Sequence, residues 1–233
     1  MDINKALTYP MDDDRWITKL LIGVLLMILS SFIIPTFFVY GYMIQIIRNV
    51  MDDVENPLPE WDDWGKLFKD GFNLFVAGLV YTLPIWLLTC CSVFAIVLPA
   101  MSEGGDAAAI LAGIGSLAII VISCLIIIFA IALMLIGPAI SIQYAREDNL
   151  SACFKFSEII GIARDNVGDI VIAIIVLVMI SFLFFFVNIV PVIGSLIWLA
   201  TNAYVLFIAA HLYGQIGIKA GGAPKEKEFD PIV

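Results

Sequence analysis

The stretch Pro57-Leu58-Pro59-Glu60-Trp61-Asp62-Asp63-Trp64-Gly65-Lys66-Leu67-Phe68-Lys69-Asp70 is the longest clearly polar run in a chain that is otherwise strongly apolar. As a helix, it would place Trp61, Trp64 and Phe68 on one face and its charged residues on the other. Pro59 fits the first turn of such a helix. Tryptophans on one face of a charged helix are typical of the membrane interface. We therefore expect an interfacial helix, and the alternative is a water-soluble helix packed on the cytoplasmic loops.

The composition places the chain among polytopic membrane proteins. Of its 233 residues, 62% are hydrophobic and 14% are charged, against roughly 45–50% and about 25% in a soluble domain. Long apolar runs without alternation predict helices and exclude a β-barrel. The formal net charge of −9 argues against a nucleic-acid partner, which requires a basic surface. Residues 1–15 carry four aspartates and no apolar run, so we expect no signal peptide.

The apolar segments on either side of the polar stretch predict a single all-α membrane domain. It would hold about six transmembrane or re-entrant helices and two cytoplasmic interfacial amphipathic helices. The apolar run over 107–145 exceeds one bilayer crossing, so it must tilt, protrude or break, and Gly137-Pro138 is the expected break. Gly105, Ala109 and Gly113, spaced by four, predict a close helix contact. The predicted parts are a hairpin (16–47) broken at Pro35, an interfacial element (48–70), a helix pair (71–145), a second interfacial element (146–166), a helix pair (167–218) and a disordered tail (219–233).

Lysine and arginine set the expected orientation. If residues 16–47 form a hairpin, all 12 Lys and Arg lie on one side, which the positive-inside rule makes cytoplasmic. We therefore predict a multi-pass protein of the inner, cytoplasmic membrane with both termini in the cytoplasm. If residues 16–47 instead cross once, Lys5, Arg15 and Lys19 lie outside and the helix count falls to five.

A short internal repeat links the two halves of the chain. Ile44-Gln45-Ile46-Ile47-Arg48 matches Ile142-Gln143-Tyr144-Ala145-Arg146, and an acidic amphipathic element and an apolar helix follow each copy. Parallel copies imply a pseudo-twofold axis along the membrane normal, although a match this short leaves chance open. Arg48 and Arg146 are expected to snorkel to the inner headgroups. In the second element, the expected apolar side holds Cys153, Phe156, Ile160 and Ala163.

Residues that could carry chemistry are sparse. The single histidine, His211, has no acid–nucleophile partner in the sequence, and we interpret it as a packing or interfacial residue. No Asp, Glu, Lys or Arg is expected deep in a helix, so we predict no coupling to protons or sodium. We predict no enzymatic activity, no catalytic, cofactor-binding or metal-binding residue, and no cofactor. The cysteines lack metal or redox spacing and are interpreted as apolar packing residues: Cys90, Cys91, Cys124 and Cys153.

Three blocks of this sequence resemble a known family. They are Ala6-Leu7-Thr8-Tyr9-Pro10, Asp14-Arg15-Trp16, and the polar stretch from its Pro-x-Pro-Glu-Trp block to Gly71. These residues are similar to the archaeal and bacterial membrane family called domain of unknown function 4013. The resemblance covers nearly the whole chain, and the Pro-x-Pro-Glu-Trp block is its specific part. It implies a membrane architecture and an archaeal or bacterial source, but no substrate, cofactor or catalytic residue.

We expect a non-enzymatic membrane module that binds lipid or a partner through its cytoplasmic amphipathic elements. The expected partners are membrane lipids, and beyond them another membrane protein or a second copy of the chain. The alternative is a passive channel or small-solute transporter built on the repeat, with Asn and Gln lining its path. Polar residues aligned on one face of several helices would favour that alternative. The candidate interfacial or partner-binding residues are Trp61, Trp64, Phe68, Arg48, Arg146 and Phe156.

Overall fold

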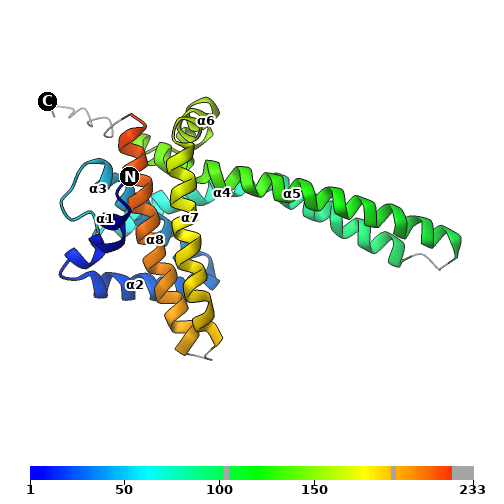
Figure 1. Ribbon diagram of the computed structural model, residues 1–233, viewed down its shortest axis with the longest axis horizontal. Helices are drawn as coiled ribbons and strands as arrows, with labels where there is room; N and C mark the ends of the chain where they lie inside the picture. The colour runs from blue at the N-terminus through cyan, green and yellow to red at the C-terminus, as the bar shows by residue number, and fades with distance from the viewer. Residues whose placement is uncertain (102–104, 190–192, 222–233) are drawn as a thin grey trace. The chain divides into compact units, whose positions relative to one another are not determined.

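The computed structural model describes residues 1–101, 105–189 and 193–221 (Figure 1). It is 87% helical, with no strand among the residues it describes, which confirms the all-α prediction. The chain folds as two compact units. The first comprises Met1–Ala77 and Ile136–Val233, and the second comprises Gly78–Leu135.

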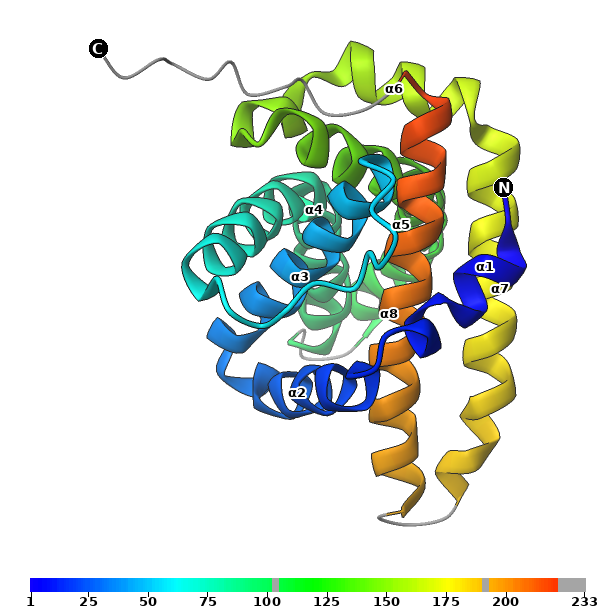
Figure 2. The ribbon, with the colours of Figure 1, turned by 90° about the vertical axis from the view of Figure 1, so that its left-hand side faces the viewer.

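Helix α8 forms the centre of the first unit. It contacts α1, α2, α3 and α7, and Figure 2 shows α7 running beside it. Large apolar side chains of α3 and α8, such as Tyr42, Ile46, Phe207 and Leu212, are fully buried there. The elements are α1 (Ile3–Thr8), η1 (Tyr9–Asp12), α2 (Trp16–Leu29), η2 (Ser30–Phe32), α3 (Ile34–Met51), α4 (Trp64–Ala100), α5 (Asp106–Glu147), η3 (Leu150–Phe154), α6 (Phe156–Asp165), α7 (Val167–Phe185), η4 (Phe186–Ile189) and α8 (Ile193–Lys219).

Four helices are long and apolar enough to cross a membrane. They extend over Trp64–Val97, Ala109–Glu147, Val167–Phe185 and Gly194–Lys219, and a fifth span arises if Ile3–Asp12 and Trp16–Phe32 count as one broken segment. The polytopic helical class is therefore confirmed, with four or five candidate spans where about six transmembrane or re-entrant helices were predicted. Residues 16–47 do form two helices, but the chain turns at Ser30–Phe32 and Ile33, ahead of Pro35.

The second unit consists of the parts of α4 and α5 that fall within Gly78–Leu135, and these lie side by side (Figure 1). Their apolar side chains are largely exposed, as expected for surfaces that face lipid. The predicted break at Gly137-Pro138 is wrong, because α5 continues through Pro138 to Glu147. Loss of one backbone N–H bond does not end a helix whose other turns stay paired.

The close helix contact lies elsewhere than predicted. A Cβ atom added to Gly113 would meet nothing within 4 Å. By contrast, a Cβ atom on Gly41 would fall on the Leu67 carbonyl group, and one on Gly71 would fall on the Phe37 carbonyl group. The backbones of α3 and α4 therefore touch at a reciprocal glycine crossing, for which the absence of both side chains is necessary.

The predicted disordered tail over 219–233 is only partly within the described residues. Helix α8 includes Lys219, and residues 220 and 221 follow it. Residues 222–233 lie outside the described part of the chain.

Candidate functional site

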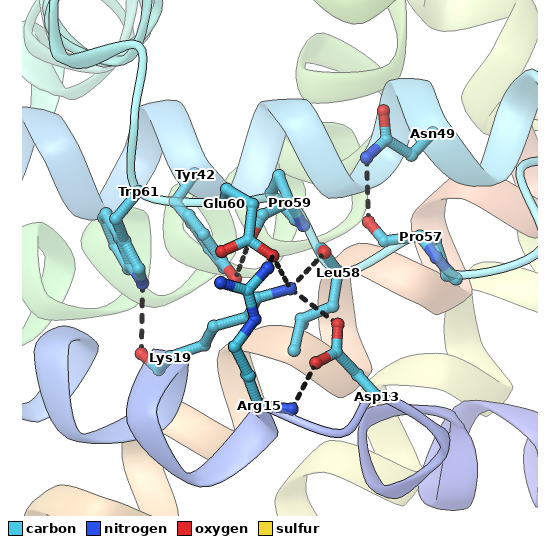
Figure 3. A network of polar contacts seen from close by, with 10 residues as sticks. All are labelled: Asp13, Arg15, Lys19, Tyr42, Asn49, Pro57, Leu58, Pro59, Glu60 and Trp61. Carbon is cyan, nitrogen blue, oxygen red and sulfur yellow. Dashed lines mark hydrogen bonds and ion pairs between the residues drawn. The ribbon is translucent and has the colours of Figure 1, made fainter.

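Residues 57–61, here called the strap, are not helical and run back along α3 (Figure 3). Asn49 donates a side-chain hydrogen bond of 2.9 Å to the Pro57 carbonyl oxygen, and the Tyr42 hydroxyl donates one of 2.9 Å to that of Pro59. The prediction that Pro59 begins a helix is therefore wrong, since α4 begins at Trp64. Side chains of α3 bond the carbonyl groups that a helix would have paired internally.

Lys19 of α2 is the centre of the strap's polar contacts (Figure 3). Its side chain is nearly fully buried and donates to the Leu58 carbonyl oxygen at 3.0 Å. It also pairs with Asp13 at 2.6 Å and with Glu60 at 2.8 Å. Arg15 pairs with Glu60 at 2.8 Å on the exposed side of this network. One buried cation thus joins α2, the strap and the segment before α2, and its two carboxylate partners offset its desolvation.

The ionisation of Asp13 reflects this network. Burial acts to raise the pKa of the Asp13 carboxyl group, but it is outweighed by the hydrogen bonds from the Lys19 side chain and the Arg15 backbone N–H and by the charges of both residues. The pKa therefore lies below its usual value. The folded protein favours the ionised carboxylate over the protonated form.

Trp61 fastens the end of the strap. Its indole Nε1–H donates to the Lys19 carbonyl oxygen at 3.1 Å, and its ring stacks on Tyr42 with centroids 4.0 Å apart. Both contacts fix the Trp61 side chain to the protein, so it is not free to insert into the membrane interface by itself.

Helix α4 begins with an exposed aromatic row. Trp64, Phe68 and Phe72 are 43%, 38% and 44% exposed, and their spacing of four places them on one helix face. Behind them Phe37 of α3 supports the row, with its ring centroid 5.4 Å from that of Phe68 and 5.5 Å from that of Phe72. Of the predicted tryptophan pair, only Trp64 therefore belongs to an exposed row.

Arg48 lies in a buried ion pair, so the prediction that it snorkels to headgroups is wrong. Its guanidinium group bonds the fully buried carboxylate of Asp70. It also pairs with Asp148 at 3.1 Å and donates to the Ala145 carbonyl oxygen at 3.1 Å. The arrangement joins the ends of α3 and α5 to the first turns of α4, and it satisfies charges that would otherwise be costly to bury.

The second oxygen of Asp70 is also satisfied. It accepts a 2.9 Å hydrogen bond from the Tyr144 hydroxyl group, which in turn accepts one of 3.0 Å from Asn73. Asp70 lies in the second turn of α4, so this charge is buried in the protein but near the helix start rather than deep in a span. This carboxylate is fully bonded on both oxygens, as a structural ion pair requires.

The remaining candidates, Arg146 and Phe156, lie apart from the aromatic row in the chain. Arg146 is half-buried and donates to the Gly217 carbonyl oxygen at 2.7 Å. Phe156, the first residue of α6, is exposed, as is Ile160. The buried side of α6 holds Ile159 and Ile162. Of the predicted apolar side, Phe156 and Ile160 therefore face outward, whereas Cys153 is buried.

The N-terminal arm docks on α8. Tyr9 donates to the Phe207 carbonyl oxygen at 3.0 Å, and Tyr204 donates to that of Leu7 at 2.6 Å. The ring of Tyr9 stacks on buried His211 with centroids 4.4 Å apart. The packing interpretation of His211 is therefore confirmed.

The cysteines divide between the two units. Cys153 is buried in η3, where burial raises the pKa of its thiol to about 11, and the packing interpretation holds for it. Cys90, Cys91 and Cys124 are exposed on the second unit, so for them it is wrong. Across residues 1–101, 105–189 and 193–221, no three His, Cys, Asp or Glu side chains lie close enough together to hold a metal ion.

Comparison with known proteins agrees with the resemblance noted from the sequence. Residues 24–197 match the sequence model of a family described as "Protein of unknown function (DUF4013)". No curated protein and no solved structure matches the chain.

Proposed function

Because the chain belongs to the DUF4013 family, whose description leaves the function open, we propose from its own geometry that it is a non-enzymatic membrane module that binds lipid at the headgroup boundary. The binding surface consists of the exposed aromatic row of α4 and the exposed apolar side of α6. The cytoplasmic face carries both elements.

The aromatic row is the observation that carries this proposal. Trp64, Phe68 and Phe72 are all more than a third exposed, although Phe37 packs behind two of them. Lys66 and Lys69 lie on the same helix turns, away from the aromatic face. Aromatic side chains beside lysines are typical of helices at the level of lipid headgroups, where the ring is buried and the ammonium group stays hydrated.

Helix α6 offers a second exposed apolar side. Its Phe156 and Ile160 are exposed while Ile159 and Ile162 pack inward. A short helix that packs one apolar side against the protein and exposes a second apolar side is suited to lie in a membrane interface.

Three of the polar side chains that a transport path would use, Asn73, Asn202 and Gln143, are engaged in hydrogen bonds. Asn73 bonds Tyr144, and Asn202 bonds the Trp198 carbonyl oxygen of its own helix. Gln143 bonds Glu147 at 2.8 Å and also bonds Glu158. These scattered contacts favour a binding module over a channel or a small-solute transporter, since Asn and Gln commonly hold helices together.

Tryptophan quenching by brominated lipid tests the proposal. The protein in nanodiscs should lose fluorescence when bromine lies near the headgroups, and Trp64→Phe should remove much of that shallow component. Trp86→Phe is the matched control, because Trp86 is exposed on the second unit; it should remove a deeper component instead. If iodide in water quenches Trp64 and brominated lipid does not, the row faces water or a soluble partner and the proposal is wrong.

A further inference from the structure

Helix α2 is too short to cross a membrane. Its 14 residues extend about 21 Å at 1.5 Å per residue, against a hydrocarbon thickness of about 30 Å. The preceding segment Ile3–Asp12 cannot extend it straight, because the two are bent by 100°. The chain then turns at η2, where Ile33 has a φ of 64°, and returns as α3.

The outer surface of this hairpin is uncharged and mostly apolar. No charged residue occurs between residues 20 and 47. The opposite side of α2 holds the buried residues Lys19, Gly23 and Leu26. A continuous apolar surface of this size needs a cover in a stable protein. The exposed large apolar residues of this surface are Ile17, Leu21, Leu25, Ile28, Leu29, Phe32, Ile33 and Ile34.

Both legs of the hairpin are held by the same strap. Lys19, near the start of α2, bonds the Leu58 carbonyl oxygen, and Tyr42 of α3 bonds that of Pro59. The charged groups of the network, Asp13, Arg15 and Glu60, lie at this strapped end and away from the turn. The hairpin is therefore polar at its strapped end and apolar at its turn. This is the distribution expected if the strapped end lies at the membrane surface and the turn lies in the lipid.

We infer that residues 16–47 form a re-entrant hairpin whose turn and outer α2 face lie among the acyl chains of a single leaflet. The chain enters and leaves that leaflet on one side. Lipid is the occupant because the surface carries no charge or hydrogen-bonding pattern that another protein would recognise, and because the same chain has at least four helices that fit a bilayer. This inference is independent of the aromatic row and of α6.

Cysteine labelling tests the side on which the turn lies. All four native cysteines are replaced by alanine, and single cysteines are introduced as Ser31→Cys at the turn, Asp12→Cys before α2 and Asp106→Cys at the start of α5. A membrane-impermeant maleimide is applied to sealed vesicles of each orientation. Asp12→Cys and Asp106→Cys should be labelled from opposite sides. Ser31→Cys should be labelled from neither side, and fully once detergent dissolves the membrane.

A nitroxide attached to a Phe32→Cys variant measures immersion directly. In nanodiscs its collisions with oxygen should exceed those with a water-soluble nickel chelate severalfold, and the ratio should reverse for Asp12→Cys. Labelling of Ser31→Cys from the Asp106 side would show that the segment crosses, and labelling from the Asp12 side would place the turn in water. Oxidative dimerisation of the Ser31→Cys variant would mean that a second copy of the chain, and not lipid, covers the apolar surface of the hairpin. Each of these three results overturns the inference.

Discussion

The buried pair of Arg48 and Asp70 makes a sharp prediction for single residues. Arg48→Met leaves the Asp70 carboxylate buried without its cation, which should cost about 3–5 kcal/mol of unfolding free energy. Unfolding in a mild detergent, followed by circular dichroism, measures the loss. Adding Asp70→Leu should recover much of it, because an apolar pair of similar volume replaces a buried ion pair at little cost.

A matched control for this pair exists on the surface. Arg164 and Asp165 pair at 3.0 Å with side chains 78% and 64% exposed. Arg164→Met should change stability by no more than about 0.5 kcal/mol. If Arg48→Met is no worse than Arg164→Met, the buried pair does not hold α3, α4 and α5 together as described.

Asp13 gives the strap a dependence on pH. Its pKa is lowered in the folded protein, so the unfolded chain binds the proton more tightly. The stabilisation from this group is therefore complete above its unfolded pKa of about 3.9 and is lost as the pH falls through the lower folded value. The stability difference between the wild type and Asp13→Asn should be largest above about pH 5 and shrink below about pH 4.

Thermal unfolding across that range measures this difference. Asp52→Asn, which removes the same charge from an exposed turn, should change the unfolding temperature little. A penalty for Asp13→Asn that grows as the pH falls would contradict the role given to the Lys19 contacts.

Among the elements, the crossing of α3 and α4 is the most sensitive to a small change. Gly71→Ala places a methyl group on the Phe37 carbonyl group and should force the helices apart, at about 1–3 kcal/mol or more. Gly113→Ala meets open space and should be neutral or stabilising by up to about 1 kcal/mol. Unfolding midpoints of the two variants in one detergent compare them. Equal midpoints would mean that the helices separate without loss.

Helix positions were predictable from the sequence, and the contacts that organise them were not. Charged and small polar residues mark the helix ends because they cannot remain in lipid, so the helices that contain residues 167–185 and 193–218 lie where predicted. The strap was missed because the tryptophan spacing suits a helix, whereas its bonds come from Lys19 and Tyr42, far along the chain.

The Arg48–Asp70 pair was missed for a related reason. Each residue looked like an ordinary charge at a helix end, and 22 residues separate them. The sequence did offer one signal for the pair: opposite charges lie on either side of the connection between two consecutive helices. Helices joined by such a connection are usually neighbours, so their charges can meet. The lone lysine in the apolar run over 16–29 was a similar signal for the strap.

For the whole molecule we expect both termini in the cytoplasm. The Asp2 backbone N–H donates to Gln215 at 2.6 Å, and the Gln215 side chain donates back at 2.9 Å, so the N-terminal arm and the end of α8 belong on one side. Fluorescent-protein fusions at each end should fluoresce and alkaline phosphatase fusions should stay inactive. An active phosphatase at the N-terminus would mean that residues 16–47 cross once.

The docking of the N-terminal arm on α8 also sets an order of events during synthesis. Tyr9 bonds a residue 198 positions later, which a ribosome adding 5–20 residues per second reaches about 10–40 s afterwards. The strap needs nothing beyond Trp61 and can close early. Tyr9 therefore lacks its partner until α8 has been synthesised. Throughout that interval the N-terminal arm is undocked and accessible to chaperones and proteases.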